Sequence, residues 1–84
     1  MNTHHLKVWP EFFRELVLGI KKVEIRRNDR NFKERDILVL QEWNPNSKKF
    51  TGFTVVRKID HLMSNLPGLE QGYVVLQISK VLQE

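Results

Sequence analysis

Apolar and polar positions along the first twenty residues predict a short strand followed by a helix. In residues 4–10, Leu6 and Val8 alternate with polar neighbours, and a period of two is typical of a strand. Pro10 suits the first turn of a helix, where its missing N–H leaves no hydrogen bond unmade. Over residues 10–19 the apolar positions recur at intervals of three and four, which predicts a helix with one buried stripe. The stripe comprises Phe12, Phe13, Leu16, Val17 and Ile20.

A second strand is predicted directly after this helix. Gly19 is the expected C-cap, because glycine enters the left-handed backbone conformation without penalty. Residues 22–26 then alternate in the sense of a strand, with Val23 and Ile25 on one face. The opposite face carries three charged residues, Lys22, Glu24 and Arg26.

Three further strands follow. Residues 36–43 begin with a continuous apolar run, consistent with a strand covered on both faces. After a tight polar turn, residues 50–62 form a long strand that we expect to bend, since Gly52 permits a bulge. A loop leads into the last strand, over residues 72–81.

This order of elements predicts an α+β fold: a five-stranded mixed β pseudo-barrel with one N-terminal helix that plugs one end. Closing the sheet into a barrel would remove the exposed strand edges that a small sheet protein must protect. A chain of 84 residues holds a single hydrophobic core, so we expect residues 1–84 to form one domain.

The composition narrows the chemistry. There is no cysteine, which excludes disulfides and thiolate metal sites. His4 and His5 are neighbours on a strand, face opposite sides and cannot share one metal. We therefore expect neither a metal nor a cofactor. No apolar run approaches the length of a membrane span, and the N-terminus lacks the apolar core of a signal peptide, so we expect a cytoplasmic protein without membrane contact.

Positive charge is concentrated after the predicted helix. The formal net charge is +4, and seven of the 14 basic residues fall within residues 21–35, together with three acids. Such a density can neutralise several phosphates. Arg26, Arg27 and Arg30 offer planar forks that bind phosphate with two bonds or stack on a base. The alternative is a solvated face whose exposed ion pairs contribute little.

Four residues in this region form a motif, G-x-K-x-x-E-x-R, that runs from the helix into the strand: Gly19, Lys21, Glu24 and Arg26. The motif resembles the signature of ASCH domains, a branch of the PUA-like superfamily. Residues 6–45 and 68–78 resemble the small stand-alone family DUF3850. In one departure, Arg35 stands where relatives usually carry glycine before the aspartate, here Asp36. A positive φ at that position would strain Arg35, but we expect the turn to tolerate arginine there.

The resemblance implies a PUA-like pseudo-barrel with a cleft beside the helix, in a superfamily associated with RNA and modified nucleotides. Lys21 and Arg26 would line the cleft as anion or base ligands. Glu24 would accept a hydrogen bond from an exocyclic amine or hold the cations in place, or it would form a buried structural pair with Arg26. We expect the protein to bind RNA, single-stranded nucleic acid or a modified nucleotide through Lys21, Lys22, Glu24, Arg26, Arg27, Arg30 and Trp43. Trp43 adjoins the hairpin turn, so we expect it to be exposed.

Two other functions remain open at this point. Some ASCH proteins are amidohydrolases that deacetylate N4-acetylcytidine, and their catalytic lysine aligns with Lys21. The hydrolase threonine, however, aligns with Glu24, and the insertion carrying the hydrolase glutamate is absent. If the protein were such an enzyme, Lys21 would act as base or nucleophile and Glu24 as the acid–base group. The other alternative is a protein-interaction or inhibitor module.

Overall fold

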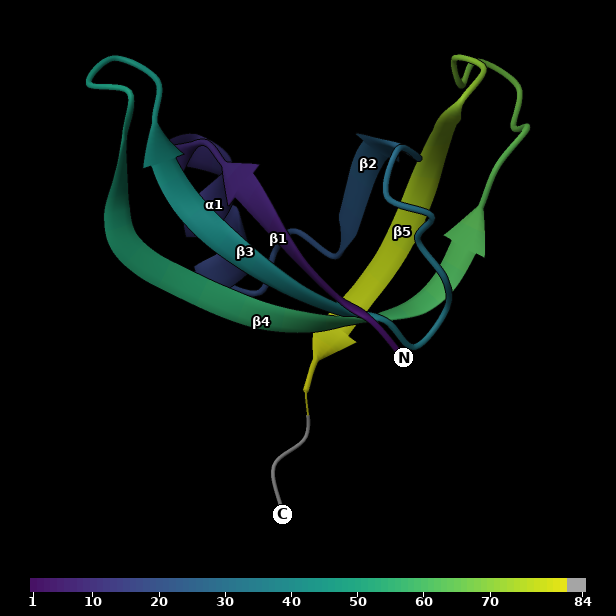
Figure 1. Ribbon diagram of the computed structural model, residues 1–84, viewed down its shortest axis with the longest axis horizontal. Helices are drawn as coiled ribbons and strands as arrows, with labels where there is room; N and C mark the ends of the chain where they lie inside the picture. The colour runs from purple at the N-terminus through teal and green to yellow at the C-terminus, as the bar shows by residue number, and fades with distance from the viewer. Residues whose placement is uncertain (82–84) are drawn as a thin grey trace.

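The computed structural model describes residues 1–81 and consists of one curled sheet with a single short helix (Figure 1). No helix in residues 1–81 is both long and apolar enough to cross a membrane. The elements, in chain order, are β1 (Thr3–Val8), α1 (Pro10–Val17), β2 (Val23–Arg27), β3 (Ile37–Asn44), β4 (Lys49–Met63) and β5 (Tyr73–Lys80).

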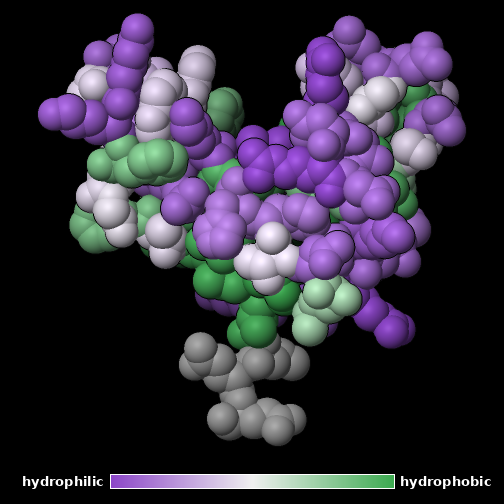
Figure 2. Space-filling view, in the orientation of Figure 1, coloured by the Kyte–Doolittle hydropathy of each residue, from purple (hydrophilic) through white to green (hydrophobic). Residues whose placement is uncertain are grey.

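The five strands form one mixed sheet in the order β1-β3-β4-β5-β2. β1 runs parallel to β3, and the other neighbouring pairs are antiparallel. β4 bends through the bottom of the molecule and contributes to both arms of the curled sheet, which end in the β3–β4 turn and the β4–β5 loop (Figure 1). Hydrophilic residues cover most of this face, with a notch between the arms (Figure 2). The predicted α+β architecture, a mixed five-stranded pseudo-barrel with one N-terminal helix, is confirmed.

The barrel is open, although the sequence led us to expect a closed one. β1 and β2 are the two edges of the sheet, and within the described residues no backbone ladder joins them. Two guanidinium groups bridge this seam instead. Arg26 Nη2 donates to the carbonyl oxygen of Lys7 at 2.9 Å, and Arg30 Nη1 donates to that of His5 at 2.8 Å. Side chains thus satisfy edge groups that would otherwise be open to another strand.

The helix is correctly predicted, but its buried stripe is narrower than expected. Only Phe13 and Leu16 are buried, whereas Phe12, Val17 and Ile20 are exposed. The reason is topological: the helix covers one end of an open half-barrel, so only one row of side chains meets the sheet.

Gly19 ends the helix as predicted, with φ of +78°. Its N–H donates to the carbonyl of Leu16, and the N–H of Ile20 donates to that of Glu15, which together make a Schellman motif.

The strands bend where the ladder carries extra residues. Between the pairs Gln41↔Thr54 and Trp43↔Phe50, β4 has a bulge that contains Gly52, as the sequence predicted. A second irregularity separates Ile59↔Ile78 from His61↔Gln77, and there Asp60 is the extra residue. These bulges let one long strand serve both arms of the sheet.

β3 is not covered equally on both faces. Leu38 and Leu40 are fully buried, whereas Ile37 and Val39 are only partly covered, which corrects the two-sided burial expected from the apolar run. The core therefore lies on one side of the sheet. It consists of Leu6, Val8, Phe13, Leu16, Phe32, Leu38, Leu40, Ile59, Val74, Leu76 and Ile78.

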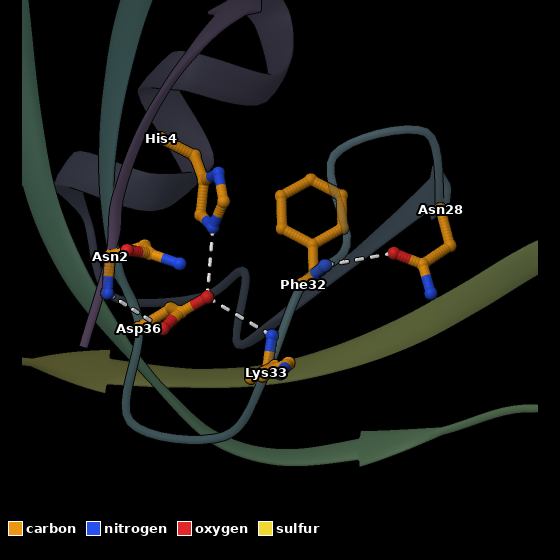
Figure 3. A network of polar contacts seen from close by, with 6 residues as sticks. All are labelled: Asn2, His4, Asn28, Phe32, Lys33 and Asp36. Carbon is orange, nitrogen blue, oxygen red and sulfur yellow. Dashed lines mark hydrogen bonds and ion pairs between the residues drawn. The ribbon is translucent and has the colours of Figure 1, made fainter.

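A buried carboxylate anchors the loop before β3 (Figure 3). Asp36 Oδ1 accepts from the N–H of Asn2 at 2.9 Å, and Oδ2 accepts from the N–H of Lys33 at 3.1 Å and contacts His4 Nε2 at 2.8 Å. Burial raises the pKa of Asp36, but these hydrogen bonds outweigh it and hold that pKa below its ordinary value. Arg35, next to it, has φ of +76°, so the turn accommodates arginine only in the left-handed conformation, which is strained for a non-glycine residue.

Candidate functional site

The motif residues approach one another because a tight helix end leads directly into an edge strand. The Schellman turn at Gly19 reverses the chain, and the N–H of Lys21 still donates to the carbonyl of Glu15 at 3.1 Å, which holds Lys21 against the helix end. In β2 the side chains alternate as predicted. Glu24 is buried and Arg26 half-buried, whereas Val23 and Ile25 are exposed. The charged face of this strand points into the protein.

A carboxylate lies between two cations at this position. Glu24 Oε2 accepts a hydrogen bond from Arg26 Nε at 2.9 Å. Glu24 Oε1 lies 3.0 Å from Lys21 Nζ, which also donates to the carbonyl oxygen of Val23. The expectation that an ammonium, a carboxylate and a guanidinium share one site is met by this geometry.

These three side chains line a pocket of about 480 Å³ along the seam between β1 and β2, which we call the seam pocket. Its size falls within the range of small-molecule sites. Most of its wall is apolar, and two aromatic side chains belong to it: Trp9, 49% exposed, and Phe12, 46% exposed. The complete lining is Lys7, Val8, Trp9, Phe12, Lys21, Val23, Glu24, Ile25 and Arg26.

Glu24 is held by side-chain cations within this pocket. The residue is 4% exposed, Arg26 donates to its Oε2, and the Lys21 ammonium forms an ion pair with its Oε1 at 3.0 Å. Lys21 and Arg26 are only partly buried, so their side chains can turn away from the carboxylate. A ligand in the seam pocket that supplies its own donor can therefore take the place of Lys21.

The other predicted ligands lie outside the seam pocket. Arg27 lies over the ring of Tyr73, with 5.6 Å between Cζ and the ring centroid. Arg30 is engaged in bridging the seam. Trp43 is half-buried rather than exposed, because Lys7 Nζ sits 4.6 Å from its ring centroid. Lys22 lines a different hollow, next to Lys21.

Sequence reasoning missed several residues that shape the site. Phe12 was assigned to the buried stripe. Adjacent residues of a helix point in different directions, so Phe12 and Phe13 need not both be buried, and this was the available signal. Lys7 was treated only as part of a strand. Arg57 interrupted an apolar pattern on β4, and the structure gives the reason: it is buried and donates from Nη2 to the carbonyl of Leu16 at 2.8 Å, which caps the helix end.

The described residues offer no metal centre, since residues 1–81 contain no group of three or more metal-ligating side chains close together. The chemistry available in the seam pocket is therefore that of a paired carboxylate, two cations and aromatic walls. The site is thus a mainly apolar pocket with a few charged groups, at the seam of an open α+β half-barrel.

The family is shown by sequence comparison. Residues 3–78 match the family described as "Domain of unknown function (DUF3850)", and the chain belongs to that family. The chain is also similar to a protein of Escherichia phage P2 described as "Uncharacterized 12.9 kDa protein in GpA 3'region", with 34% identity over 75 residues. That match covers 89% of this chain and 66% of the phage protein, so the chain spans just under two thirds of its relative's length.

Proposed function

We propose that the protein is a non-catalytic, PUA-like module of the ASCH type that binds RNA or a nucleotide, with one base held in the seam pocket. The observation that carries the proposal is Glu24: a carboxylate that is 4% exposed, lines the seam pocket and is paired with the side chains of Lys21 and Arg26. Phosphate binding alone would be weakened by a carboxylate, whereas a base edge offers N–H donors to it. Such a role would place the protein in the cytoplasm.

The walls of the seam pocket support a flat, aromatic ligand. Trp9 and Phe12 come from the start of the helix and are about half exposed, and Ile25 from β2 is also exposed. Base–aromatic stacking contributes about 1–3 kcal/mol per base. Aromatic walls provide this stacking energy for any base, while Glu24 selects among bases by the groups on their edges.

The proposal predicts a ranking of nucleosides. Cytidine and adenosine present an exocyclic amine to Glu24, whereas uridine presents only its N3–H, which lies between two carbonyl oxygens that a carboxylate repels. We expect cytidine to bind at least about 10-fold more tightly than uridine, since an unpaired buried acceptor costs about 1–3 kcal/mol. Calorimetric titration with each nucleoside measures this ratio, and equal or tighter binding of uridine contradicts the proposal.

Matched variants separate base recognition from general charge effects. Glu24→Gln replaces an acceptor by a group that also donates, so it should shift preference from cytidine toward uridine. Glu15→Gln removes the same charge from an exposed helix position outside the pocket and should leave the ranking unchanged. Quenching of tryptophan fluorescence that disappears in Trp9→Phe would place the base against that wall.

The hydrolase alternative has one supporting contact, the 3.0 Å approach of Lys21 Nζ to Glu24. The same contact counts against it, since an amine that forms the cation of an ion pair is not free to act as base or nucleophile. Incubation with N4-acetylcytidine and detection of cytidine by mass spectrometry decides the matter. Absence of product, or undiminished activity of Lys21→Ala, excludes the enzyme.

Tight association with an acidic protein, with no nucleoside bound, would favour an interaction module instead.

A further inference from the structure

A second hollow lies on the other side of Lys21, and its lining is far more basic than that of the seam pocket. It has a volume of about 550 Å³ and lies between the end of α1, the start of β2, the middle of β4 and the end of β5. We call it the basic pocket. Five of its eight lining residues are cationic and none is acidic: the set is Gly19, Lys21, Lys22, Arg57, Lys58, Ile78, Ser79 and Lys80.

Some of these cations have partners within the protein. Both terminal nitrogens of Arg57 donate to backbone carbonyls, at 2.9 and 2.8 Å. Lys21 pairs with Glu24, and Lys58 Nζ lies 3.7 Å from a carboxylate oxygen of Asp60. Within residues 1–81, no acidic side chain lies within ion-pair distance of the two exposed lysines of the pocket, Lys22 and Lys80. The lining therefore keeps an excess of positive charge.

The register of the sheet concentrates this charge. Arg57 is paired directly with Lys80 across β4 and β5, and like charges at directly opposed positions destabilise an antiparallel pair. On the next rung, Lys58 is paired with Ser79, and their side chains leave the sheet on the opposite face. An anion in the basic pocket would relieve the repulsion between Arg57 and Lys80.

We propose that the basic pocket is a phosphate subsite, which takes a phosphate group of the same nucleotide or RNA strand whose base occupies the seam pocket. This inference rests on the proposed function for its ligand but on separate residues for its geometry. Lys21 lines both pockets, so base and phosphate would bind on its two sides. Lys22, one of the predicted ligands that lie outside the seam pocket, would then bind the phosphate.

The first experiment tests the subsite without a nucleoside. Amide chemical shifts of the isotopically labelled protein are followed by NMR while sodium pyrophosphate is added. We expect saturable shifts at Gly19, Ser79 and Lys80, and their loss in the double variant Lys22→Gln/Lys80→Gln. The matched control, Lys33→Gln/Lys48→Gln, removes the same charge from exposed positions outside both pockets and should retain them. Non-saturating shifts, or equal losses in both doubles, overturn the subsite.

The second experiment distinguishes the source of the phosphate. Affinities are compared for cytidine, cytidine 5′-monophosphate and a cytidine dinucleotide with one internal phosphodiester. If the site takes a terminal phosphate, the monophosphate should bind at least about 5-fold more tightly than cytidine. If it takes a backbone phosphate, only the dinucleotide should show this gain over cytidine. Either gain should vanish in Lys22→Gln/Lys80→Gln and persist in the control double. No gain with either ligand overturns the subsite.

The two proposals fail in different ways. If cytidine binds but neither phosphate adds affinity, the seam pocket stands and the basic pocket is not a subsite. If pyrophosphate saturates the basic pocket while no nucleoside binds the wild type, the phosphate site stands and base recognition is wrong.

With longer RNA, each lost phosphate contact should reduce the slope of log affinity against log salt concentration by about 0.7, and only the Lys22→Gln/Lys80→Gln double should show this change.

Discussion

The protein buries two carboxylates to nearly the same extent, yet their surroundings differ. Asp36 is 2% exposed and Glu24 is 4% exposed. Asp36 accepts from two backbone N–H groups and contacts His4, so both of its oxygens are engaged. Glu24 accepts from Arg26 through one oxygen and forms an ion pair with Lys21 through the other, so its partners are side chains, and it lines a pocket.

This difference separates an anchor from a ligand-binding group. A buried carboxylate whose acceptors are all used by fixed donors stabilises the fold and has nothing to offer a ligand. A carboxylate held by side chains that are only partly buried can exchange one of them for a donor of a ligand. Degree of burial alone would not have distinguished the two residues.

The largest expected effect is on stability, at Asp36. Asp36→Ala leaves His4 and two backbone N–H groups without their acceptor, and we expect the free energy of unfolding to fall by about 2–4 kcal/mol. Urea denaturation followed by circular dichroism measures it. Asp29→Ala, at an exposed position, is the control and should change stability by less than about 0.5 kcal/mol. A loss no larger than that of the control would remove Asp36 from its role as an anchor.

Glu24→Gln should weaken ligand binding more than stability, which is the reverse of the effect expected for Asp36→Ala. Lys21 and Arg26 are only partly buried and can turn toward water, so we expect unfolding free energy to change by less than about 1 kcal/mol. Binding of cytidine should weaken at least about 10-fold, or about 1.4 kcal/mol. The contrast with Asp36 breaks down if this variant unfolds as readily as Asp36→Ala or binds cytidine like the wild type.

Acid should destabilise the protein through Asp36. Because the pKa of Asp36 is lower in the folded than in the unfolded state, its stabilising contribution is fully present above the unfolded pKa of about 4 and is lost as the pH falls through the folded pKa. The loss should be smaller than in Asp36→Ala, since a protonated carboxyl still forms hydrogen bonds. Unfolding midpoints between pH 6 and pH 3 measure this effect. Asp36→Asn should show a flatter pH dependence, and an equally steep one assigns the effect to other groups.

The smallest expected effect is a gain in stability beside the anchor. Arg35 adopts a left-handed conformation while its N–H donates to the carbonyl of Ile59 at 2.7 Å. Arg35→Gly removes the strain of φ +76°, offset in part by the greater freedom of glycine in the unfolded chain. We expect a net stabilisation of about 0.5–1 kcal/mol by thermal denaturation. Arg35→Ala retains the strain and should give no gain, so equal gains in both variants would locate the effect in the lost charge.

The helix and the strand that follows it show what the sequence could predict. The alternation in β2 and the helix end at Gly19 were readable from the pattern, whereas the convergence of Lys21, Glu24 and Arg26 was implied by the family resemblance of the motif. The direction in which β2 faces was not readable. This edge strand turns its charged side inward because Lys21 and Arg26 pair with Glu24 and because the carbonyl of Lys7 accepts from Arg26. Lys21 and Arg26 are near Glu24 in the sequence, but Lys7 lies on another strand.

The amino-acid pattern by itself determined the elements, their order and the motif, because periodicity, capping and turn chemistry act over a few neighbouring residues. Tertiary structure alone decided that the barrel stays open between β1 and β2, that Asp36 is held by backbone N–H groups whereas Glu24 is held by side chains, and that Arg57 and Lys80 face one another across the sheet. The bridges across the open seam, the contacts of Asp36 with Asn2 and His4, and the Arg57–Lys80 pair join residues 19 to 34 positions apart. No local pattern encodes such pairings, because they are fixed only when the whole sheet curls and packs.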